Sequence, residues 1–331
     1  MSSFEFVSAL LLLAAILGIV NHLYVHLPRT IGVMVGSLIL SIIIILIDRS
    51  IDVVELREWW QQLVVSTDLP RVFLDGLLAF MLFAGSLHVD MDSLRAHKWT
   101  VLVLATVGVV MATALYGFGI WFIFRDTVPL AWCFALGALL APTDPIAVGG
   151  LLKQAGLPPG LLAVVNGESL FNDGVAVVVF AVTLEWANGH VATPATMAAD
   201  LLIEAGGGIV LGLATGYLAY RALRLIDEPG LELTITLALV TVTYSVASAL
   251  HVSGPLAVVV AGLLTGHRST RFAMTDRSRR EVILFWDMMD ELLNTVLFLL
   301  MGFALLSVDI DTHLLLGAAG GIGLSLVTRL I

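Results

Sequence analysis

Three carboxylates in two neighbouring apolar stretches could hold a cation or a proton. Asp144 lies in the stretch APTDPIAVGG, residues 141–150, and Glu168 and Asp173 lie in VNGESLFNDGVAVVVF, residues 165–180. An aspartate inside hydrocarbon costs on the order of 2.5–3.5 kcal/mol on insertion scales, so such a residue normally faces a polar cavity or a partner. These three acids are therefore the first candidates for a functional site.

Two prolines flank Asp144 and predict a break in its helix. Pro145 has no backbone donor and Pro142 disturbs the helix before it, so nearby carbonyls lose their partners and can turn toward a cation or water. Broken helices near the midplane carry the ion sites of secondary transporters. We expect a broken helix over Ala141–Pro145. The alternative is that Asp144 only caps a kinked helix.

The second stretch places its polar residues on two adjoining stripes of one helix. Four-residue spacing aligns Glu168 with Asn172, and Ser169 with Asp173. Two bare carboxylates would repel one another, so at least one must be neutralised by a proton, a cation or a basic partner. Arg329 is the one basic residue clearly inside an apolar span, and we pair it with Glu168.

That pairing leaves Asp173 and Asp144 for exchange chemistry. A carboxylate removed from water favours its protonated form, yet it releases the proton to a competing cation. Hard monovalent cations prefer oxygen ligands, which Asp144, Asp173, Ser169 and the backbone carbonyl of Thr143 would supply. One site would then hold a proton or a cation in turn. Exchange across a membrane needs no covalent step, so we expect no enzyme and no cofactor.

The composition requires a membrane for these elements. Hydrophobic residues make up 59% of the 331 residues, charged residues make up 13%, and the mean hydropathy is +1.01. A bilayer core about 30 Å thick needs roughly 20 apolar residues per span. The fold class is therefore an all-α polytopic membrane protein. We predict eleven spans near 6–25, 30–47, 71–88, 99–123, 128–152, 160–184, 200–222, 231–250, 254–266, 283–306 and 314–331.

Basic residues in the connections predict the orientation, because Lys and Arg accumulate on the cytoplasmic side of short loops. The odd connections hold eleven: Arg29, Arg95, Lys98, Lys153, Arg221, Arg224, Arg268, Arg271, Arg277, Arg279 and Arg280. The even connections hold four: Arg49, Arg57, Arg71 and Arg125. We therefore expect the N-terminus outside. The first span has no basic region or cleavage site of a signal peptide, so we expect it to be retained.

Other sequence features narrow the function. The single cysteine, Cys133, permits no internal disulfide and no cysteine metal cluster. There is no glycine-rich nucleotide loop, so direct ATP hydrolysis is not expected. Glycines at Gly208, Gly212 and Gly216 share one helix face, which favours close helix packing over an ion path.

The motifs PTDP, residues 142–145, and GESLFND, residues 167–173, resemble those of the monovalent cation:proton antiporters, in the branch of NhaP-like sodium/proton exchangers. Supporting stretches are FAGSLHVDMDSLR, SGPLAVVVAGLL and LLNTVLFLLMG. The resemblance implies that Asp173 is the carboxylate shared by cation and proton. It associates Asp144, Ser169 and the backbone oxygen of Thr143 with the ion site, for sodium, lithium or potassium.

The resemblance also implies a polar cluster of Glu168 and Asn172 with the later Arg329. Asn172 in place of a second aspartate is typical of the branch expected to exchange one proton per cation. Some relatives carry an acid where this chain has Ala84, so a further ligand is absent here.

For the fold, the resemblance implies about thirteen spans in two inverted repeats, so the chain looks incomplete at its C-terminus. It implies a core at 71–190 and 281–331, and scaffold spans at 1–70 and 191–280. The expected setting is the bacterial inner membrane, with lipid, monovalent cations and protons as partners, a homodimer, and no nucleic acid.

Two alternatives belong to other classes. An intramembrane protease could use paired aspartates to activate water, but the sequence lacks the GxGD pattern of such enzymes and the GxSG pattern of the serine type. A non-transporting scaffold or sensor, or a truncated antiporter fragment, would keep the acids as remnants. Cation-driven transport separates these hypotheses.

Overall fold

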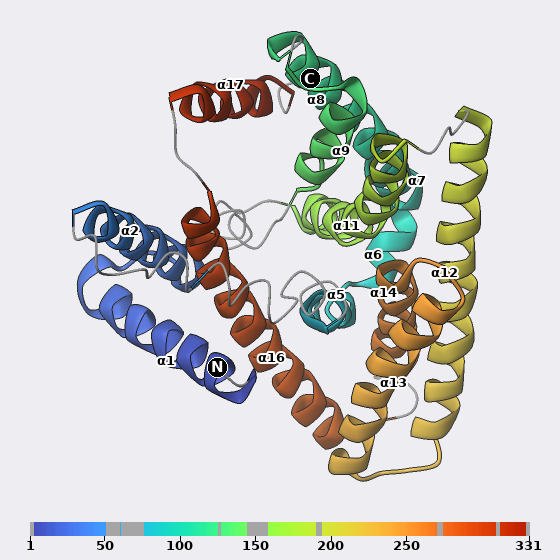
Figure 1. Cartoon of the computed structure of the whole chain (residues 1–331). Coiled ribbons are helices and arrows are strands. Elements are labelled where there is room, and N and C mark those ends of the chain that lie inside the picture. Colours follow the sequence, from blue (N-terminus) through green and yellow to red (C-terminus); the bar gives the residue numbers. More distant parts are fainter. Residues whose placement is uncertain are drawn as a thin grey trace. The chain divides into compact units, whose positions relative to one another are not determined.

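The computed structural model describes residues 3–50, 60, 76–124, 127–143, 158–189, 194–269, 274–308 and 312–328. Every regular element within these ranges is a helix. Figure 1 shows these helices, coloured from blue at the N-terminus to red at the C-terminus. The predicted site residues Asp144 and Arg329 lie outside the described ranges, as does Pro145.

Seven of the described helical segments are apolar and long enough to cross a membrane: Glu5–Val25, Arg29–Asp48, Lys98–Ile123, Gly160–Ala187, Leu202–Leu223, Pro229–Ala249 and Asp276–Ser307. Four shorter apolar helices cover Leu78–Leu87, Leu130–Leu140, Gly254–His267 and Gly317–Thr328. Each of these segments overlaps one predicted span. The all-helical membrane class is confirmed, while the count of eleven crossings and the inverted repeats remain predictions.

The chain divides into two compact units, the first formed by residues 1–81 and 286–311. In it, α1 (Ser3–Val20) continues through the π-helical turn η1 (Asn21–Val25), and α2 (Arg29–Ser50) packs beside α1. The later part of α16 (Asp276–Phe303) and the short η5 (Ala304–Ser307) complete this unit. Its buried core includes Phe6, Val33 and Leu299. Such apolar packing, together with an exposed ion pair of 2.6 Å between Arg29 and Glu291, joins α16 to α2.

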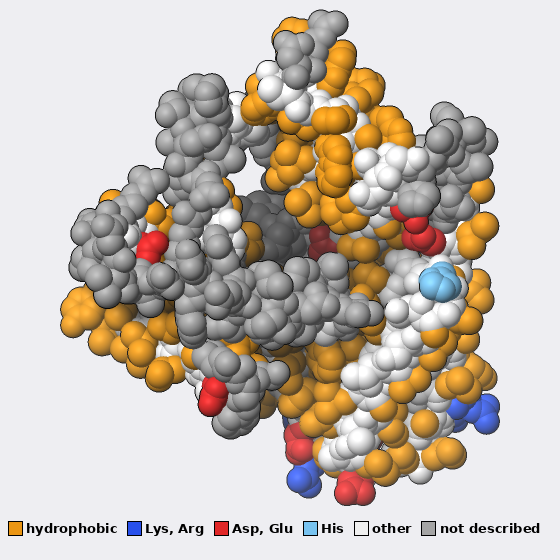
Figure 2. Space-filling model, in the orientation of Figure 1, with side chains coloured by type: hydrophobic (Ala, Val, Ile, Leu, Met, Phe, Trp, Pro, Cys, Tyr) orange, Lys and Arg blue, Asp and Glu red, His pale blue; other side chains and the backbone are white. Residues whose placement is uncertain are grey.

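The second unit, residues 82–285 and 312–331, contains the predicted site stretches. Its helices are the end of α5 (Leu78–Leu87), α6 (Met91–Ala96), α7 (Lys98–Val103), the π-helical η3 (Leu104–Gly108), α8 (Val109–Ile123), α9 (Leu130–Leu140), α11 (Pro159–Ala187), α12 (Pro194–Leu223), α13 (Pro229–Ala249), α14 (Gly254–Leu264), η4 (Thr265–Ser269), the start of α16 and α17 (Thr312–Thr328). Helices α8, α9 and α11 pack together, and α12 packs on α13 and α14. Figure 2 shows hydrophobic side chains along α12 and α13 and charged side chains near their ends, as expected for helices that face lipid.

The glycine stripe of α12 is a packing surface, as the sequence predicts. A Cβ on Gly208 would lie 2.6 Å from the carbonyl oxygen of Ser253, and one on Gly212 would overlap the carbonyl oxygen of Ala257. At Gly216 the neighbour is the Cα of Ala261, at 3.0 Å. The backbones of α12 and α14 therefore approach closely along this face, and any side chain there would push them apart.

Candidate functional site

Helix α11 carries four of the predicted site residues. It begins at Pro159, where a missing backbone donor is tolerated in the first turn, and it ends before Gly189, whose φ of +91° is left-handed. Glu168 and Asn172 therefore lie on one stripe of this helix, with Ser169 and Asp173 on the next, as predicted.

Helix α9 ends at Leu140, directly before the predicted break. Ala141, Pro142 and Thr143 are not helical. Ala141 still has α-helical dihedral angles, and Pro142 ends the helical hydrogen bonds because its ring removes a backbone donor. The broken helix over Ala141–Pro145 stays a prediction, because the part from Asp144 onward lies outside the described residues.

The side chain of Thr143 reaches from this interrupted segment to α11. Its hydroxyl lies 3.2 Å from Oε1 and 3.1 Å from Oε2 of Glu168, to which it donates. The same hydroxyl accepts a 3.0 Å hydrogen bond from Nδ2 of Asn172. One threonine therefore fixes the end of α9 to two polar residues of α11.

Glu168 is the acceptor at the centre of this cluster. Asn172 Nδ2 donates to its Oε1 at 2.7 Å, and Ser169 Oγ donates to its Oε2 at a longer 3.5 Å. With the hydroxyl of Thr143, three neutral donors surround one carboxylate. Neutral donors stabilise a partly buried carboxylate without a formal counter-ion. Together, these residues form the Glu168 cluster: Glu168, Thr143, Ser169 and Asn172.

The sequence predicted this cluster in part. It aligned Glu168 with Asn172, which the 2.7 Å hydrogen bond confirms. It did not foresee the hydroxyl of Thr143 as a donor to Glu168, having assigned only the backbone oxygen of Thr143 to the ion. The one sequence feature that could have indicated this contact is the position of Thr143 directly before Asp144 in an apolar stretch. The role of the backbone oxygen stays a prediction.

Asn172 is buried, with 1% of its surface exposed, and its Oδ1 has no hydrogen-bond partner among the described residues. A buried amide oxygen without a donor costs about 1–3 kcal/mol, so a donor is expected nearby. Arg329 is the donor that the sequence predicts, and it lies beyond the last described residue.

Asp173 follows Asn172 and is half-buried. Ser169 lies one turn before it on the same stripe. Of the four predicted ion ligands, Thr143 and Ser169 are brought together, because both hydroxyls contact Oε2 of Glu168. On the adjacent surface of α11, a Cβ on Gly174 would lie 2.6 Å from Cδ2 of Leu256, so α14 packs directly beside Asp173. No group of three or more His, Cys, Asp or Glu residues that could hold a metal is found among the described residues.

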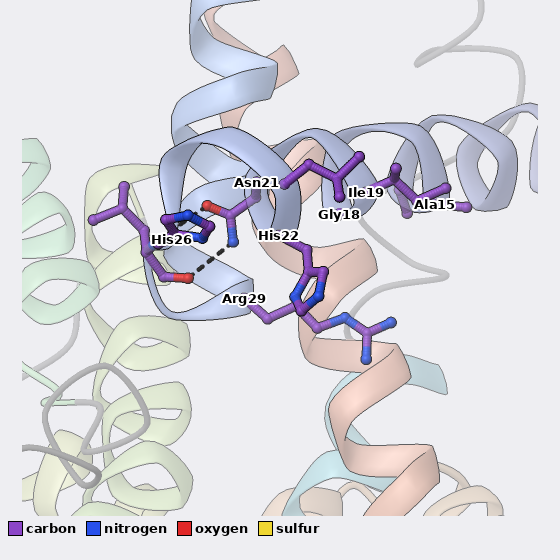
Figure 3. A pocket seen from close by; sticks show the side chains of 10 residues that line it. Ala15, Gly18, Ile19, Asn21, His22, His26 and Arg29 are labelled. Carbon is purple, nitrogen blue, oxygen red and sulfur yellow. Dashed lines mark hydrogen bonds between the residues drawn. The ribbon is translucent and has the colours of Figure 1, made fainter.

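A separate pocket lies in the first unit. It has a volume of about 680 Å³ and lies at the turn between α1 and α2, where Figure 3 shows His22, His26 and Arg29 around it. Asn21 shapes the turn, because its Nδ2 donates to the carbonyl oxygen of Leu27 at 2.9 Å and its Oδ1 accepts from the Leu27 backbone N–H at 3.2 Å. None of the predicted ion ligands lines this pocket.

Comparisons with known proteins agree with the motifs. The family described as "Sodium/hydrogen exchanger, transmembrane" matches residues 8–331. The chain is 41% identical over 333 residues to the Na(+)/H(+) antiporter NhaP of Pseudomonas aeruginosa, covering 99% of this chain and 78% of that protein. It is 32% identical over 237 residues to the Na(+)/H(+) antiporter NhaH of Halobacillus dabanensis, covering 70% of this chain and 58% of that one.

Among solved structures, the sodium proton antiporter MjNhaP1 from Methanocaldococcus jannaschii matches with a TM-score of 0.74. The match covers 97% of this chain and 75% of that chain, at 20% sequence identity. At this identity the likeness concerns the fold alone. The chain therefore spans about three quarters of two of these proteins and less than two thirds of NhaH.

Proposed function

The chain belongs to the sodium/hydrogen exchanger family, and from this premise we propose that it exchanges Na⁺ for H⁺ across a membrane by alternating access. The NhaP-like resemblance seen in the motifs is confirmed by the family match and by the 41% identity to an antiporter. The relatives named as Na⁺/H⁺ antiporters favour this function over a non-transporting scaffold. Transport by such a protein is physical exchange rather than covalent catalysis.

The observation that carries the proposal is the Glu168 cluster. Two carboxylates five residues apart in a membrane helix each need a compensating partner. Donors from Thr143, Asn172 and Ser169 compensate Glu168, so its oxygens are committed to the structure. Asp173 is then the carboxylate within the membrane part of α11 that binds Na⁺ and H⁺ in turn.

The proposed cycle uses one site with two competing occupants. Na⁺ binds through oxygen atoms of Asp173 and Ser169, with Asp144 and the backbone oxygen of Thr143 as further ligands. When H⁺ binds Asp173, the carboxylate loses its charge and the Na⁺ leaves. Exposure of the loaded site to each side in turn couples the two fluxes. With Asn172 in place of a second acid, one proton is exchanged for one cation, so the cycle is electroneutral. Li⁺ and K⁺ are the other cations with the same ligand chemistry.

The remaining parts of the proposal concern the assembly. We place the N-terminus outside, in the inner membrane of a bacterium, and assign the ion site to core spans at 71–190 and 281–331. Spans at 1–70 and 191–280 form the scaffold through which two copies dimerise, surrounded by lipid. Arg329 donates to Glu168 and Asn172.

The test is Na⁺-driven collapse of a pH gradient in proteoliposomes, followed with a pH-sensitive dye. The wild-type protein dissipates the gradient when Na⁺ is added, and Asp173→Asn does not, because an amide cannot carry the proton. Glu228→Gln is a matched control, since Glu228 is exposed and lies outside the Glu168 cluster. No transport by the wild-type protein would favour the scaffold alternative. Full transport by Asp173→Asn would exclude the proposed site.

A further inference from the structure

Two cavities lie side by side against the last three turns of α11. The inner one, about 180 Å³, is lined by Val177 and Val178 of α11 and by Ser253 and Pro255 at the start of α14. The outer one, about 280 Å³, is lined by Glu185 of α11 and by His251 after α13. Ala181 and Glu204 line both cavities. They therefore form one interrupted path, called the α11 path below.

The α11 path begins one turn from Asp173. Val177 lies four residues after Asp173 on nearly the same face of α11, and the row through Ala181 and Glu185 winds about 40° further around the helix at each four-residue step. At 1.5 Å per residue, Glu185 lies about 18 Å along the helix from Asp173, and the inner cavity begins about one turn from it. The path thus leads from the end of α11 toward the proposed ion carboxylate.

Leucine packing separates the path from Asp173. Leu256 follows the cavity-lining Pro255, is buried with 3% of its surface exposed, and packs on Gly174, the residue after Asp173. The backbone N–H of Ser253 donates to the carbonyl oxygen of Glu204 at 3.0 Å, which fixes the start of α14 to α12. The described conformation is therefore closed between the inner cavity and Asp173.

The charge of the path suits a cation. Glu204 is half-buried and shared by both cavities, while Glu185 is exposed at the outer one. Carboxylates at a narrow entrance with apolar walls concentrate cations and raise their rate of entry by tenfold or more.

We propose that the α11 path is the entrance through which a hydrated monovalent cation reaches Asp173 from the side where α11 ends, with Glu204 as the residue that draws it in. Leu256 closes the entrance against Gly174 in the present conformation. This inference rests on the proposed exchange function. Under the orientation given by the basic loops, the entrance faces the outside.

Kinetics from each side test Glu204. For Glu204→Gln, we expect the KM for Na⁺ at the face where α11 ends to rise about fivefold, with kcat and the KM at the opposite face unchanged, because the carboxylate acts on approach. Proton affinity at the same face must fall by the same factor, since the equilibrium of exchange is fixed. Screening with an inert salt reduces the difference from wild type. Glu228→Gln removes the same charge outside the path and leaves all these values unchanged.

Thiol labelling tests the path independently. The sequence has one cysteine, the buried Cys133, so Cys133→Ala provides a background. In that background, Val177→Cys should react with a membrane-impermeant thiosulfonate added at the face where α11 ends. Val179→Cys, a position buried in the α8–α9–α11 core, should not react.

The outcomes separate this inference from the function it rests on. If the wild-type protein shows no exchange, the proposed function fails. If exchange is intact while Glu204→Gln has a wild-type KM at both faces, or Val177→Cys reacts from the opposite face alone, the entrance is wrong and the function stands. An equal rise of the KM for Na⁺ at both faces would show that Glu204 has a structural role and does not attract the cation.

Discussion

Asn172 donates a 2.7 Å hydrogen bond to Oε1 of Glu168, four residues earlier on α11. The amide also donates to Thr143, which in turn reaches both oxygens of Glu168. This arrangement ties the interrupted end of α9 to the helix that carries Asp173. The helix that carries Asp173 is thus held in place by Glu168, whose oxygens already accept hydrogen bonds. Changes to the Glu168 cluster should therefore affect both stability and transport.

Removing the hydroxyl of Thr143 should loosen the Glu168 cluster. Thr143→Val keeps the shape of the side chain but removes one of the three donors to Glu168 and one acceptor of the Asn172 amide. We expect a loss of about 1–3 kcal/mol of stability, seen as a lower melting temperature in detergent, together with slower exchange. Thr143→Ser retains the hydroxyl and should stay within about 0.5 kcal/mol of the wild type. Equal melting temperatures for Thr143→Val and wild type would show that the hydroxyl is dispensable.

Replacing Asn172 by aspartate should make stability depend on pH. The new carboxylate would lie at hydrogen-bond distance from Glu168, so the folded protein must hold a proton between them that the unfolded chain releases. The folded state then binds more protons, and stability falls as pH rises, by up to about 1.4 kcal/mol per pH unit. Melting temperatures of Asn172→Asp at pH 5 and pH 8 measure this. A pH-independent difference from wild type would contradict the shared proton.

Competition for Asp173 predicts how pH changes the kinetics. When protons occupy the site, the KM for Na⁺ rises about tenfold for each unit of falling pH, while the maximal rate measured at saturating Na⁺ stays constant, because both ligands bind the same carboxylate. A fall in cytoplasmic pH should therefore slow transport. Initial rates over a Na⁺ series from pH 5 to pH 8 test this. Activity that rises steadily from pH 8 to pH 5 would contradict simple competition.

The glycine stripe offers a paired test of helix packing. Gly212→Ala places a Cβ onto the carbonyl oxygen of Ala257, so α12 and α14 must separate, at a cost of about 1–3 kcal/mol. Gly206→Ala, two turns away in the same helix, meets nothing within 4 Å and should stabilise by about 0.5–1 kcal/mol through helix propensity. Thermal unfolding of the two variants should shift in opposite directions. Equal shifts would exclude close packing as the cause.

The sequence predicts contacts within one helix well, and it predicts contacts between segments far apart in the chain poorly. Helical spacing within α11 correctly aligned Glu168 with Asn172, because residues four apart meet in any α-helix. The prediction that Gly208, Gly212 and Gly216 form one packing face is correct for the same reason. The hydroxyl of Thr143 donating to Glu168 was missed, because it depends on how a non-helical segment folds back on another helix. The cavities at Glu204 arise only from the packing of α11, α12 and α14, which no spacing along the chain predicts.

Glu232 is a buried acid outside the proposed ion site. No part of this residue at the start of α13 is exposed, and neither carboxylate oxygen has a hydrogen-bond partner among the described residues. The buried hydroxyl of Ser278 faces this carboxylate in poor hydrogen-bond geometry, and Asp227 adds a negative charge in the vicinity. A carboxylate with so little compensation in this position is unfavourable. Glu232→Gln removes the charge and adds a donor that Ser278 can accept, so we expect the free energy of unfolding to rise by about 1–2 kcal/mol. The exposed Glu228→Gln should leave it unchanged. A lower melting temperature for Glu232→Gln would instead mean that a cation or a basic group compensates this carboxylate in the folded protein.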